Sequence, residues 1–405
     1  MDDHDLERLL HEAASSFRAE HSRSAPLVLT RRRSRALPAA AGLVTAALVA
    51  LVALVLPAHL TNQGSPATTP AGALPTTSPS PHGVFSPPSS FDPKMAQVTS
   101  VALDGRWLAI AGGEGSAASR DRLEVRDRSD LAHVWATIST SYPLGSPTCL
   151  ALDGDTLLWT DQENSDSLSS PGPPTRWSLW ERDLLTGRTQ RLVQGKPREA
   201  MVDELPCAVA GGGLAAWNLD GRLVVRDLVH HRLAATYREQ TGTVAMTTSG
   251  LVLATYRNGA SGGQGPLDVS LRSGPALARK AFLVRAPNGV HLSAGGGHLL
   301  VGSRDPSSQI SDAVEVSTCE LAHCSGLKLL RRDNGARAVV GADFAAWTGN
   351  YPVFARFDGG PVPDAAPGYV SFTSLAAFGD TLAYATETED LKHSTMHLQV
   401  MTPSN

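Results

Sequence analysis

The stretch Gly259-Ala-Ser261-Gly-Gly263 matches the G-x-S-x-G pattern of serine hydrolases. That chemistry requires the serine on a strained turn between a strand and a helix, with a histidine and an acid further along the chain. Here the serine lies in a glycine-rich stretch, residues 258–265, and no helical pattern follows it. The neighbouring pair His230-His231 is expected on a turn and lacks the spacing of metal ligands. We therefore expect neither hydrolase chemistry nor a metal centre at these positions.

A second group of candidates consists of acidic residues in polar segments between apolar runs. They are Glu114, Asp121, Asp161, Glu163, Asp166, Asp305, Asp312, Glu387, Glu389 and Asp390. Brought to one face, these carboxylates would form a ring that could take a cation or a basic partner. Ordinary solvated surface loops are the alternative interpretation. The spacing of the acids around residues 161–166 lacks the glycine and the terminal glutamate of a calcium loop, so no cofactor is predicted.

An internal repeat indicates the elements that would position these residues. Its unit is a glycine, two variable residues, Leu or Phe, and then small or apolar residues. It begins at Gly105, Gly154, Gly211, Gly250, Gly296, Gly341 and Gly379. The spacings of 38 to 57 residues average about 46, which is the length of one β-propeller blade. Because a short apolar stretch precedes each glycine, the unit predicts two strands joined by a tight turn.

Two further strands complete each unit. An alternating stretch that ends in Asp follows most of the glycines, at residues 123–127, 179–183, 223–227 and 353–358. A turn and a fourth strand come next, most clearly in residues 183–193. The prediction is an all-β propeller of seven four-stranded blades, with six or eight left open. The last unit ends after its third strand, residues 397–401, and we expect the segment from Lys94 to Thr99 to supply the missing outer strand and close the ring.

Two parts of the repeat carry a family pattern. Asp104-Gly105 with Leu108-Ala109 forms a D-G-x-x-L-A hairpin, and residues 183–192 follow Φ-x-Φ-x-D-L-x-T-G-x-x-x-x-L from its Asp-Leu onward. In these features the chain resembles WD-repeat and TolB-type β-propellers. The resemblance implies a propeller domain over residues 94–405 and carries no activity, because one fold serves many functions.

The chain has four cysteines. Cys319 and Cys324 lie where the units place the turn between third and fourth strands, and their spacing suits a disulfide across a hairpin. Cys149 and Cys207 lie five and four residues before their glycines, on first strands of consecutive units. A bond between neighbouring blades is the favoured interpretation, although the register difference leaves their pairing open. A location outside the cytoplasm favours both bonds.

The N-terminal part of the chain predicts a membrane anchor. Residues 36–56 form an uncharged apolar run of 21 residues, long enough to cross a bilayer as a helix. Four arginines within residues 31–35 precede the run, so the positive-inside rule places residues 1–35 in the cytoplasm and the C-terminal domain outside the cell. We expect one transmembrane helix at 36–58 in the cell membrane, with a cleaved twin-arginine export signal as the alternative.

The segments that flank this span differ in character. Residues 1–35 contain the apolar pattern of a short amphipathic helix, which would be a docking helix for a cytoplasmic partner or a frayed tail. Residues 59–93 are rich in Pro, Ser and Thr and predict a linker. The layout resembles membrane-anchored anti-sigma factors, but no cysteine before Cys149 is available for their zinc motif.

The charge composition of the chain excludes one class of function. Charged residues make up 18% of the chain and the net charge is −4, which excludes a chain-wide nucleic-acid surface. We expect a non-catalytic recognition module that binds protein, peptide or glycan outside the membrane. One alternative is a signal transducer with the propeller as sensor and residues 1–35 as relay. Another is an enzyme at the propeller axis, such as a lyase or glycosidase, which would need ionisable groups converging there.

Overall fold

Antiparallel strands make up almost all of the structure that the computed structural model describes. The described residues are 84–113, 122–142, 145–163, 176–195, 205–239, 241–256, 267–286, 291–304, 313–334, 338–348, 352–357, 375–387 and 393–402. All of them belong to one unit of the chain, Thr76–Asn405. The predicted cytoplasmic helix and the predicted span at 36–58 lie outside them. Within the described ranges, no helix has the length and apolarity needed to cross a bilayer.

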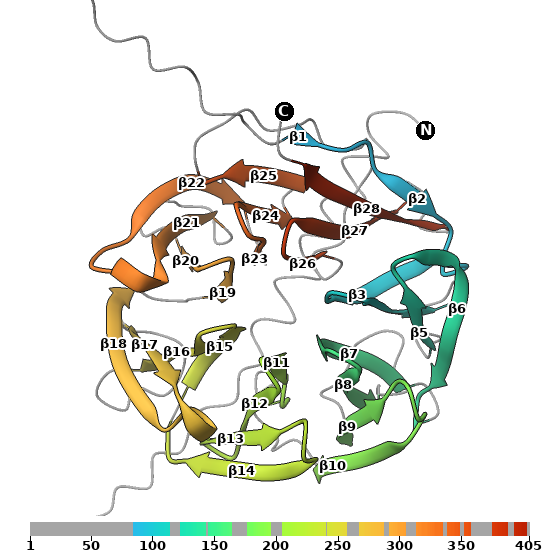
Figure 1. Ribbon diagram of the computed structural model, residues 1–405, viewed down its shortest axis with the longest axis horizontal. Coiled ribbons are helices and arrows are strands. Elements are labelled where there is room, and N and C mark those ends of the chain that lie inside the picture. Colours follow the sequence, from blue (N-terminus) through green and yellow to red (C-terminus); the bar gives the residue numbers. More distant parts are fainter. Residues whose placement is uncertain are drawn as a thin grey trace, which may run out of the picture. The chain divides into compact units, whose positions relative to one another are not determined.

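Seven sheets stand around a central axis as the blades of a propeller (Figure 1). Blade 1 contains β3 (Gln97–Leu103), β4 (Trp107–Gly113), β5 (Arg122–Asp127) and β6 (Asp130–Ser139), and blade 2 contains β7 (Gly145–Asp153), β8 (Thr156–Glu163), β9 (Trp177–Asp183) and β10 (Thr189–Gly195). Blade 3 contains β11 (Val209–Gly211), β12 (Leu214–Leu219), β13 (Arg222–Asp227) and β14 (Arg232–Tyr237), and blade 4 contains β15 (Thr241–Thr247), β16 (Gly250–Tyr256), β17 (Leu267–Ser273) and β18 (Arg279–Ala286). Blade 5 contains β19 (His291–Gly295), β20 (His298–Arg304), β21 (Ala313–Glu320) and β22 (Lys328–Asn334). Blade 6 contains β23 (Ala338–Val340), β24 (Phe344–Thr348) and β25 (Pro352–Arg356). Blade 7 contains β26 (Leu375–Phe378), β27 (Thr381–Glu387) and β28 (Ser394–Thr402). The first strand of each blade is the innermost. The predicted all-β propeller with seven blades is confirmed.

Tight turns join the first and second strands at the glycines of the repeat. In blade 5, Gly296 has a φ of 53°, and a Cβ there would lie 2.3 Å from the backbone of Ala342 in the turn of blade 6. Glycine is therefore required both for the left-handed backbone and for the close approach of the next blade. Ala342 N in turn donates to Gly379 O of blade 7 at 2.6 Å. The repeated glycine thus forms the hairpin and also lets adjacent turns pack together.

A separate hydrophobic cluster fills each joint between neighbouring blades. The described residues form seven such clusters, and each draws on two adjacent blades. The second strands lie between two joints, so every residue of β4 and of β27 is buried. This explains why neither strand alternates apolar and polar residues: β4 has no polar side chain apart from the indole N–H, and β27 has an apolar run, residues 382–385, at its centre. The cluster that contains Ile110, Ala385 and Leu398 joins blade 7 to blade 1 and closes the ring.

The closing strand comes from a different segment than the sequence predicted. β1 (Val84–Phe85) and β2 (Ser89–Phe91) both pair antiparallel with β28 and complete blade 7. The assignment of this strand to Lys94–Thr99 was wrong, because Lys94 lies in a turn and Gln97 already begins β3, the innermost strand of blade 1. Both strands fall within the segment 59–93 that was assigned to the linker. Pro87 and Pro88 lie between the two strands rather than in them, so the Pro-rich composition of the segment does not prevent this pairing.

Candidate binding surface

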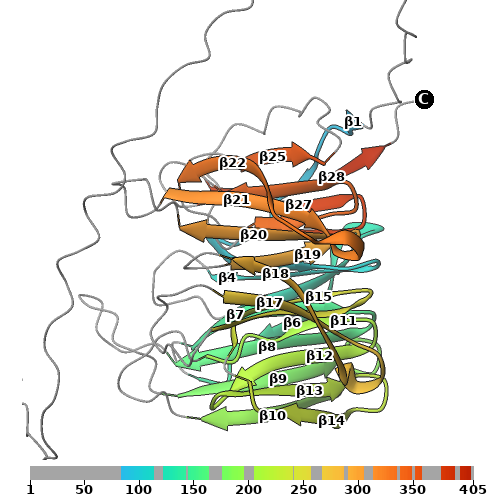
Figure 2. The same ribbon diagram turned by 90° about the vertical axis from the view of Figure 1, so that its left-hand side faces the viewer.

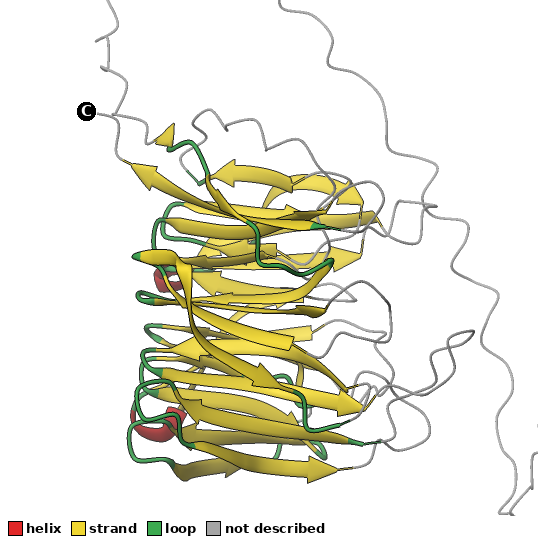
Figure 3. Ribbon diagram, turned by 90° about the vertical axis from the view of Figure 1, so that its right-hand side faces the viewer, coloured by secondary structure: helices red, strands yellow, loops and turns green. Residues whose placement is uncertain are grey.

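The hairpin turns gather at one face of the propeller, which we call the turn face. It carries the turns between first and second strands and those between third and fourth strands, as the green segments of Figure 3 show. The short helices η3 (Pro275–Leu277) and η4 (Leu321–His323) also lie there. Each strand runs between this face and the opposite face of the ring, so the second strands, which begin at the turn face, end at the opposite face (Figure 2).

On the turn face, a cluster of one arginine and two tryptophans joins blade 1 to blade 2. The rings of Trp107 and Trp135 have centroids 5.2 Å apart and are tilted by 51°. The guanidinium of Arg106 lies 4.3 Å from the centroid of Trp107 and 5.7 Å from that of Trp135. Trp107 is fully buried, whereas 42% of Trp135 is exposed. The buried ring thus supports an exposed Trp–Arg pair, the residue types that dominate the binding energy of protein interfaces.

Local hydrogen bonds fix the position of this cluster. Asp104 Oδ1 accepts from the backbone N–H of Arg106 at 2.9 Å and of Trp107 at 2.7 Å, which holds the first turn of blade 1. Burial raises the pKa of Asp104, in opposition to these hydrogen bonds. The indole N–H of Trp107 donates to Asp155 Oδ1 at 2.9 Å, and that of Trp135 donates to Leu184 O at 2.9 Å. Both tryptophans are therefore anchored to the adjacent blade.

A cavity of about 560 Å³ lies beside this cluster, at the joint between blades 7 and 1. Its wall combines apolar side chains such as Leu398 with guanidinium and hydroxyl groups from Arg106, Arg128 and Thr381. Asp127, the one carboxylate of the wall, is paired with Arg106 at 3.0 Å. Hydrogen bonds from Ser129 and from Arg106 lower the pKa of Asp127 to about 2, so it is ionised at neutral pH. The wall therefore has an excess of one positive charge.

Exposed apolar side chains extend the surface across blades 2 and 3. Leu185 is 55% exposed and Val229 is 70% exposed, each in the turn between the third and fourth strands of its blade. Leu184 N donates to Asp155 O at 2.8 Å, which places the turn of Leu185 next to the anchor of Trp107. We call Arg106, Trp135, Leu185 and Val229, together with the cavity, the Trp135 surface. An apolar patch with an arginine and a polar rim has the composition of a protein-binding interface.

The predicted acidic residues that the structure describes do not share this surface. Of the ten, Asp161, Glu163 and Glu387 are described, and they lie at the ends of the second strands β8 and β27 rather than between strands. Asp161 is fully buried and accepts from Ser141 N at 2.5 Å; burial raises its pKa. Glu163 pairs with Arg176 at 2.9 Å. Glu114, Asp121, Asp166, Asp305, Asp312, Glu389 and Asp390 lie outside the described residues. In the described part of the chain, no three His, Cys, Asp or Glu residues are grouped as metal ligands.

Three arginines near the ends of third strands, Arg126 and Arg272 buried and Arg226 half-buried, form ion pairs within a blade or between neighbouring blades. Each donates to the carbonyl five residues further on, across the following turn: Arg126 to Leu131 at 2.6 Å, Arg226 to His231 at 2.9 Å and Arg272 to Leu277 at 3.1 Å. Each also pairs with a carboxylate: Glu124, Glu181 and Glu239 respectively. This set was not predicted from the sequence, although Arg126 and Arg226 each directly precede the Asp that ends the strand. These charges stabilise the structure and are already engaged within it.

The remaining candidates from the sequence are the histidine pair, the G-x-S-x-G motif and ionisable groups at the axis. His230 and His231 lie on a turn, as predicted, and their Nδ1 atoms are 2.8 Å from carboxylate oxygens of Asp227 and Glu181. The Gly259–Gly263 motif lies outside the described residues. Among the innermost strands as described, Asp153 is the one Asp, Glu, Lys or Arg, and it accepts from Gly213 N of the next blade at 2.6 Å. The described part of the axis therefore presents no group of converging acids and bases.

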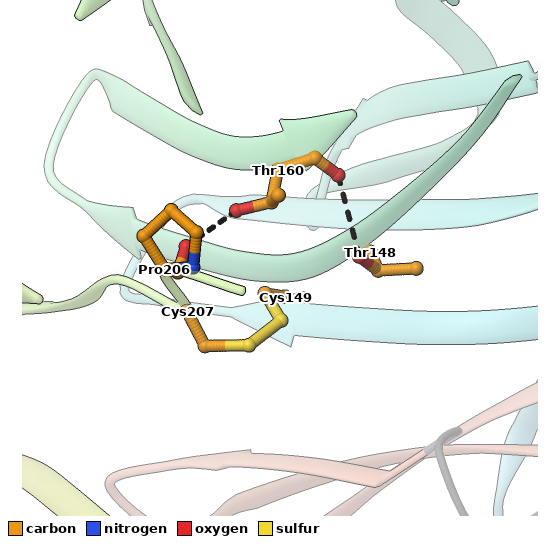
Figure 4. The surroundings of a disulfide bond; sticks show 5 residues. All are labelled: Thr148, Cys149, Thr160, Pro206 and Cys207. Carbon is orange, nitrogen blue, oxygen red and sulfur yellow. Dashed lines mark hydrogen bonds between the residues drawn. A yellow bond between two sulfur atoms is a disulfide. The ribbon is translucent and has the colours of Figure 1, made fainter. Parts of the chain in front are cut away.

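Both cysteine pairs form disulfides. Cys319 and Cys324 bracket η4 at the turn of blade 5, as expected for a hairpin bond. Cys149 of β7 bonds to Cys207, two residues before β11, and so links the innermost strands of blades 2 and 3 (Figure 4). The interpretation that these two cysteines pair is confirmed.

Comparisons with known proteins agree on the fold. The chain matches no family model and no curated protein. The β-propeller domain of the trilobed protease from Pyrococcus furiosus has a TM-score of 0.54 and 9% identity, over 78% of this chain and 98% of that one. The acylaminoacyl peptidase of Pyrococcus horikoshii has a TM-score of 0.51 and 9% identity, over 75% of this chain and 52% of that one. This chain thus spans about half of that peptidase.

A further similar structure is the β-propeller domain of Cps50 (Swd1) from Myceliophteria thermophila, with a TM-score of 0.48 and 12% identity, over 78% of this chain and 100% of that one. The likeness to the two Pyrococcus structures, at 9% identity, shows the fold and no activity. The chain is therefore defined as a seven-bladed β-propeller protein. Its N-terminal strands close the ring, whereas the propeller domain of the trilobed protease has an open velcro topology.

Proposed function

We propose that this protein is a membrane-anchored, extracytoplasmic recognition module that binds a protein partner through the Trp135 surface. The observation that carries the proposal is the exposed indole of Trp135, held beside Arg106 by a buried tryptophan and by a hydrogen bond to blade 2. Preorganised Trp and Arg side chains bind partners at little entropic cost. The apolar run at 36–58 and the arginines before it support the anchor and its orientation.

The chemistry of the surface suggests what the partner presents. The cavity wall has two guanidiniums against one carboxylate, and it also includes the apolar side chains of Leu398 and Val400. An acidic side chain next to an apolar one would complement both features. Leu185 and Val229 would then lie under the periphery of the partner, where apolar contacts exclude water.

Site-specific cross-linking in intact cells tests the surface. A photoreactive amino acid replaces Leu185 in one strain and Phe282 in another. Phe282 of β18 is the matched control, because it is an apolar side chain with 59% exposure on blade 4. We expect a discrete cross-linked product from position 185 that disappears with Trp135→Ala, weakens with increasing salt and is absent from position 282. Equal products from both positions, or a product insensitive to Trp135→Ala, would refute the proposed surface.

Protease treatment of spheroplasts tests the anchor separately. The full chain carries a tag at each terminus. A C-terminal tag that is removed and an N-terminal tag that stays protected in the membrane fraction support the proposed topology. Release of a mature propeller into the medium would identify residues 36–58 as an export signal and would overturn the anchored state, without affecting the cross-linking result.

A further inference from the structure

The two disulfides differ in their accessibility. Cys207 is exposed and Cys149 is half-buried, whereas Cys319 and Cys324 are both buried. The Cys149–Cys207 bond also joins two different blades, while the Cys319–Cys324 bond stays within one turn. A disulfide exchanges with an external thiolate only if one sulfur can be approached. The first bond is therefore the reactive candidate, and the second provides an internal reference.

The backbone around the accessible bond is held in a strained conformation. Cys149 has a φ of 52°, and it is the one non-glycine residue in a described strand with a left-handed backbone. β7 bulges at this point, because Thr148 pairs with Thr160 whereas Ala151 pairs with Leu158. Such a conformation persists only where the surroundings impose it, and bulges are common beside functional sites.

One hydrogen bond near the disulfide also links blade 2 to the entry of blade 3. The hydroxyl of Thr160, on β8, donates to Pro206 O at 2.5 Å (Figure 4). Thr160 is fully buried, and the hydrophobic cluster between blades 2 and 3 includes Leu158, Ala208 and Ala215. These contacts do not depend on the disulfide. Opening the disulfide would therefore release the bulge and the entry to β11 while the joint stays packed.

We propose that Cys149–Cys207 is a thiol–disulfide exchange site that takes a small dithiol or the dithiol of a reductase. A thiolate of the dithiol attacks Sγ of the exposed Cys207 and forms a mixed disulfide; the original S–S bond breaks, and Cys149 leaves as a thiolate that takes a proton from water. The second thiol loses its proton and attacks the reagent's own sulfur in the mixed disulfide. Cys207 leaves as a thiolate and is protonated, and the reagent becomes a disulfide. Two electrons pass from the dithiol to the cystine. This site goes beyond the recognition role, and it rests on the proposed function only for the location of the propeller outside the membrane.

Two states of the protein follow from this exchange. In the oxidised state the innermost strands of blades 2 and 3 are covalently linked. In the reduced state the residues around the bond, 145–153 and 205–211, open more often, while the rest of the ring keeps its exchange protection. The device would adjust the stiffness of one joint of the propeller to the redox state outside the membrane.

Reduction kinetics on the full-length, membrane-inserted protein test the proposal. The oxidised protein is incubated with dithiothreitol without denaturant, quenched with iodoacetamide and digested for mass spectrometry. We expect Cys149 and Cys207 to be alkylated at least tenfold faster than Cys319 and Cys324. Amide hydrogen exchange in 145–153 and 205–211 should rise at least tenfold on reduction, with no change in the innermost strand of blade 5.

Matched variants separate the switch from general damage. Cys149→Ser/Cys207→Ser should reproduce the exchange pattern of the reduced protein without any reductant, and Cys319→Ser/Cys324→Ser should not. Equal alkylation rates for the two pairs would overturn the proposal. Faster alkylation at Cys149 and Cys207 with no rise in local exchange would overturn the two-state behaviour. The kinetic comparison uses the unmodified chain, so it remains decisive if a serine variant fails to fold.

Discussion

The ion pair between Glu181 and Arg226 provides a quantitative test of how neighbouring blades are held together. Glu181 lies on β9 of blade 2 and Arg226 on β13 of blade 3, and their side chains are only 2% and 11% exposed. Arg226 donates to both carboxylate oxygens and to His231 O. Gln190 and His231 also approach Glu181 Oε1, at 2.7 Å and 2.8 Å. The carboxylate is thus buried and fully engaged.

Arg226→Met removes the positive charge while its thioether fills part of the same space. It leaves Glu181 ionised in a buried position without its cationic partner, and breaking a buried pair in this way costs about 3–5 kcal/mol. Arg226→Met/Glu181→Met removes both charges, and replacement of a whole buried pair by apolar groups ranges from neutral to stabilising by about 1–4 kcal/mol. The double variant should therefore be more stable than the single variant.

Guanidinium-induced unfolding at pH 7, followed by tryptophan fluorescence, measures these differences. Arg232→Met is the matched control, because Arg232 is 71% exposed and lies 3.7 Å from Asp227. Its loss should change the free energy of unfolding by less than about 1 kcal/mol. If Arg226→Met costs no more than Arg232→Met, or if the double variant is no better than the single one, the pair does not hold the joint.

The pH dependence of the free energy of unfolding tests the same ion pair, and the pKa of Glu181 fixes the direction of the change. Burial raises the pKa of Glu181, but hydrogen bonds from Arg226, His231 and Gln190 outweigh it and hold the pKa below the ordinary value of 4.5. The unfolded chain therefore binds a proton before the folded chain does. The contribution of Glu181 to stability is fully present above pH 4.5 and is lost as the pH falls through the folded-state pKa. Without Arg226, this acid-induced loss should disappear.

Three further predictions concern the disulfides, the binding surface and the closure of the ring. Because the two disulfides close loops with separations of 58 and 5 residues, Cys149→Ser/Cys207→Ser should lower the free energy of unfolding by about 4 kcal/mol and Cys319→Ser/Cys324→Ser by about 2 kcal/mol, as measured by guanidinium unfolding. Trp135→Ala should cost only about 1 kcal/mol by the same measurement, because the indole is 42% exposed, while it abolishes the cross-link from position 185. Burial lowers the pKa of His397, whose ring nitrogens each lie 2.8 Å from a hydroxyl, of Ser90 on β2 and of Thr386. Its stabilising effect is complete above pH 6.5 and is lost as the pH falls towards the folded-state pKa, so amide exchange in β2 should rise below pH 6.5 and His397→Gln should remove that dependence.

The repeat made the ring predictable from the sequence because it is local in the chain. A glycine in a tight turn and an apolar second strand are requirements that each blade meets separately, so seven glycines predict seven blades. The bond between Cys319 and Cys324 was predictable for the same reason, since it lies within one turn.

Features that depend on contacts between distant segments were harder to predict. The closing strands lie in a Pro-rich segment and pair with β28, more than 300 residues away, as the separation of 307 between Ser90 and His397 shows. Pro87 and Pro88 fall between the two short strands, and the composition of the segment does not reveal that the residues around them pair. Asp161 was assigned to a loop because its side chain is charged. In the structure β8 continues past Asp161, and the side chain is buried. The Trp135 surface arises from adjacent blades, and no spacing in the sequence marks it.

Binding at the turn face and closure of the ring should be coupled, because they share residues. Ser86 and Ser89 of the closing segment line the cavity together with Leu398 and Val400 of β28, and Arg106 lines it from blade 1. A partner that occupies this cavity contacts both sides of the joint between blades 7 and 1, so it binds the closed ring more tightly than a ring whose closing strands have detached. By reciprocity, any change that detaches β1 and β2 weakens binding by the same factor. A weakened closing segment, such as that of the full chain below pH 6.5, should therefore lose the cross-link from position 185 while blades 3 to 5 keep their exchange protection.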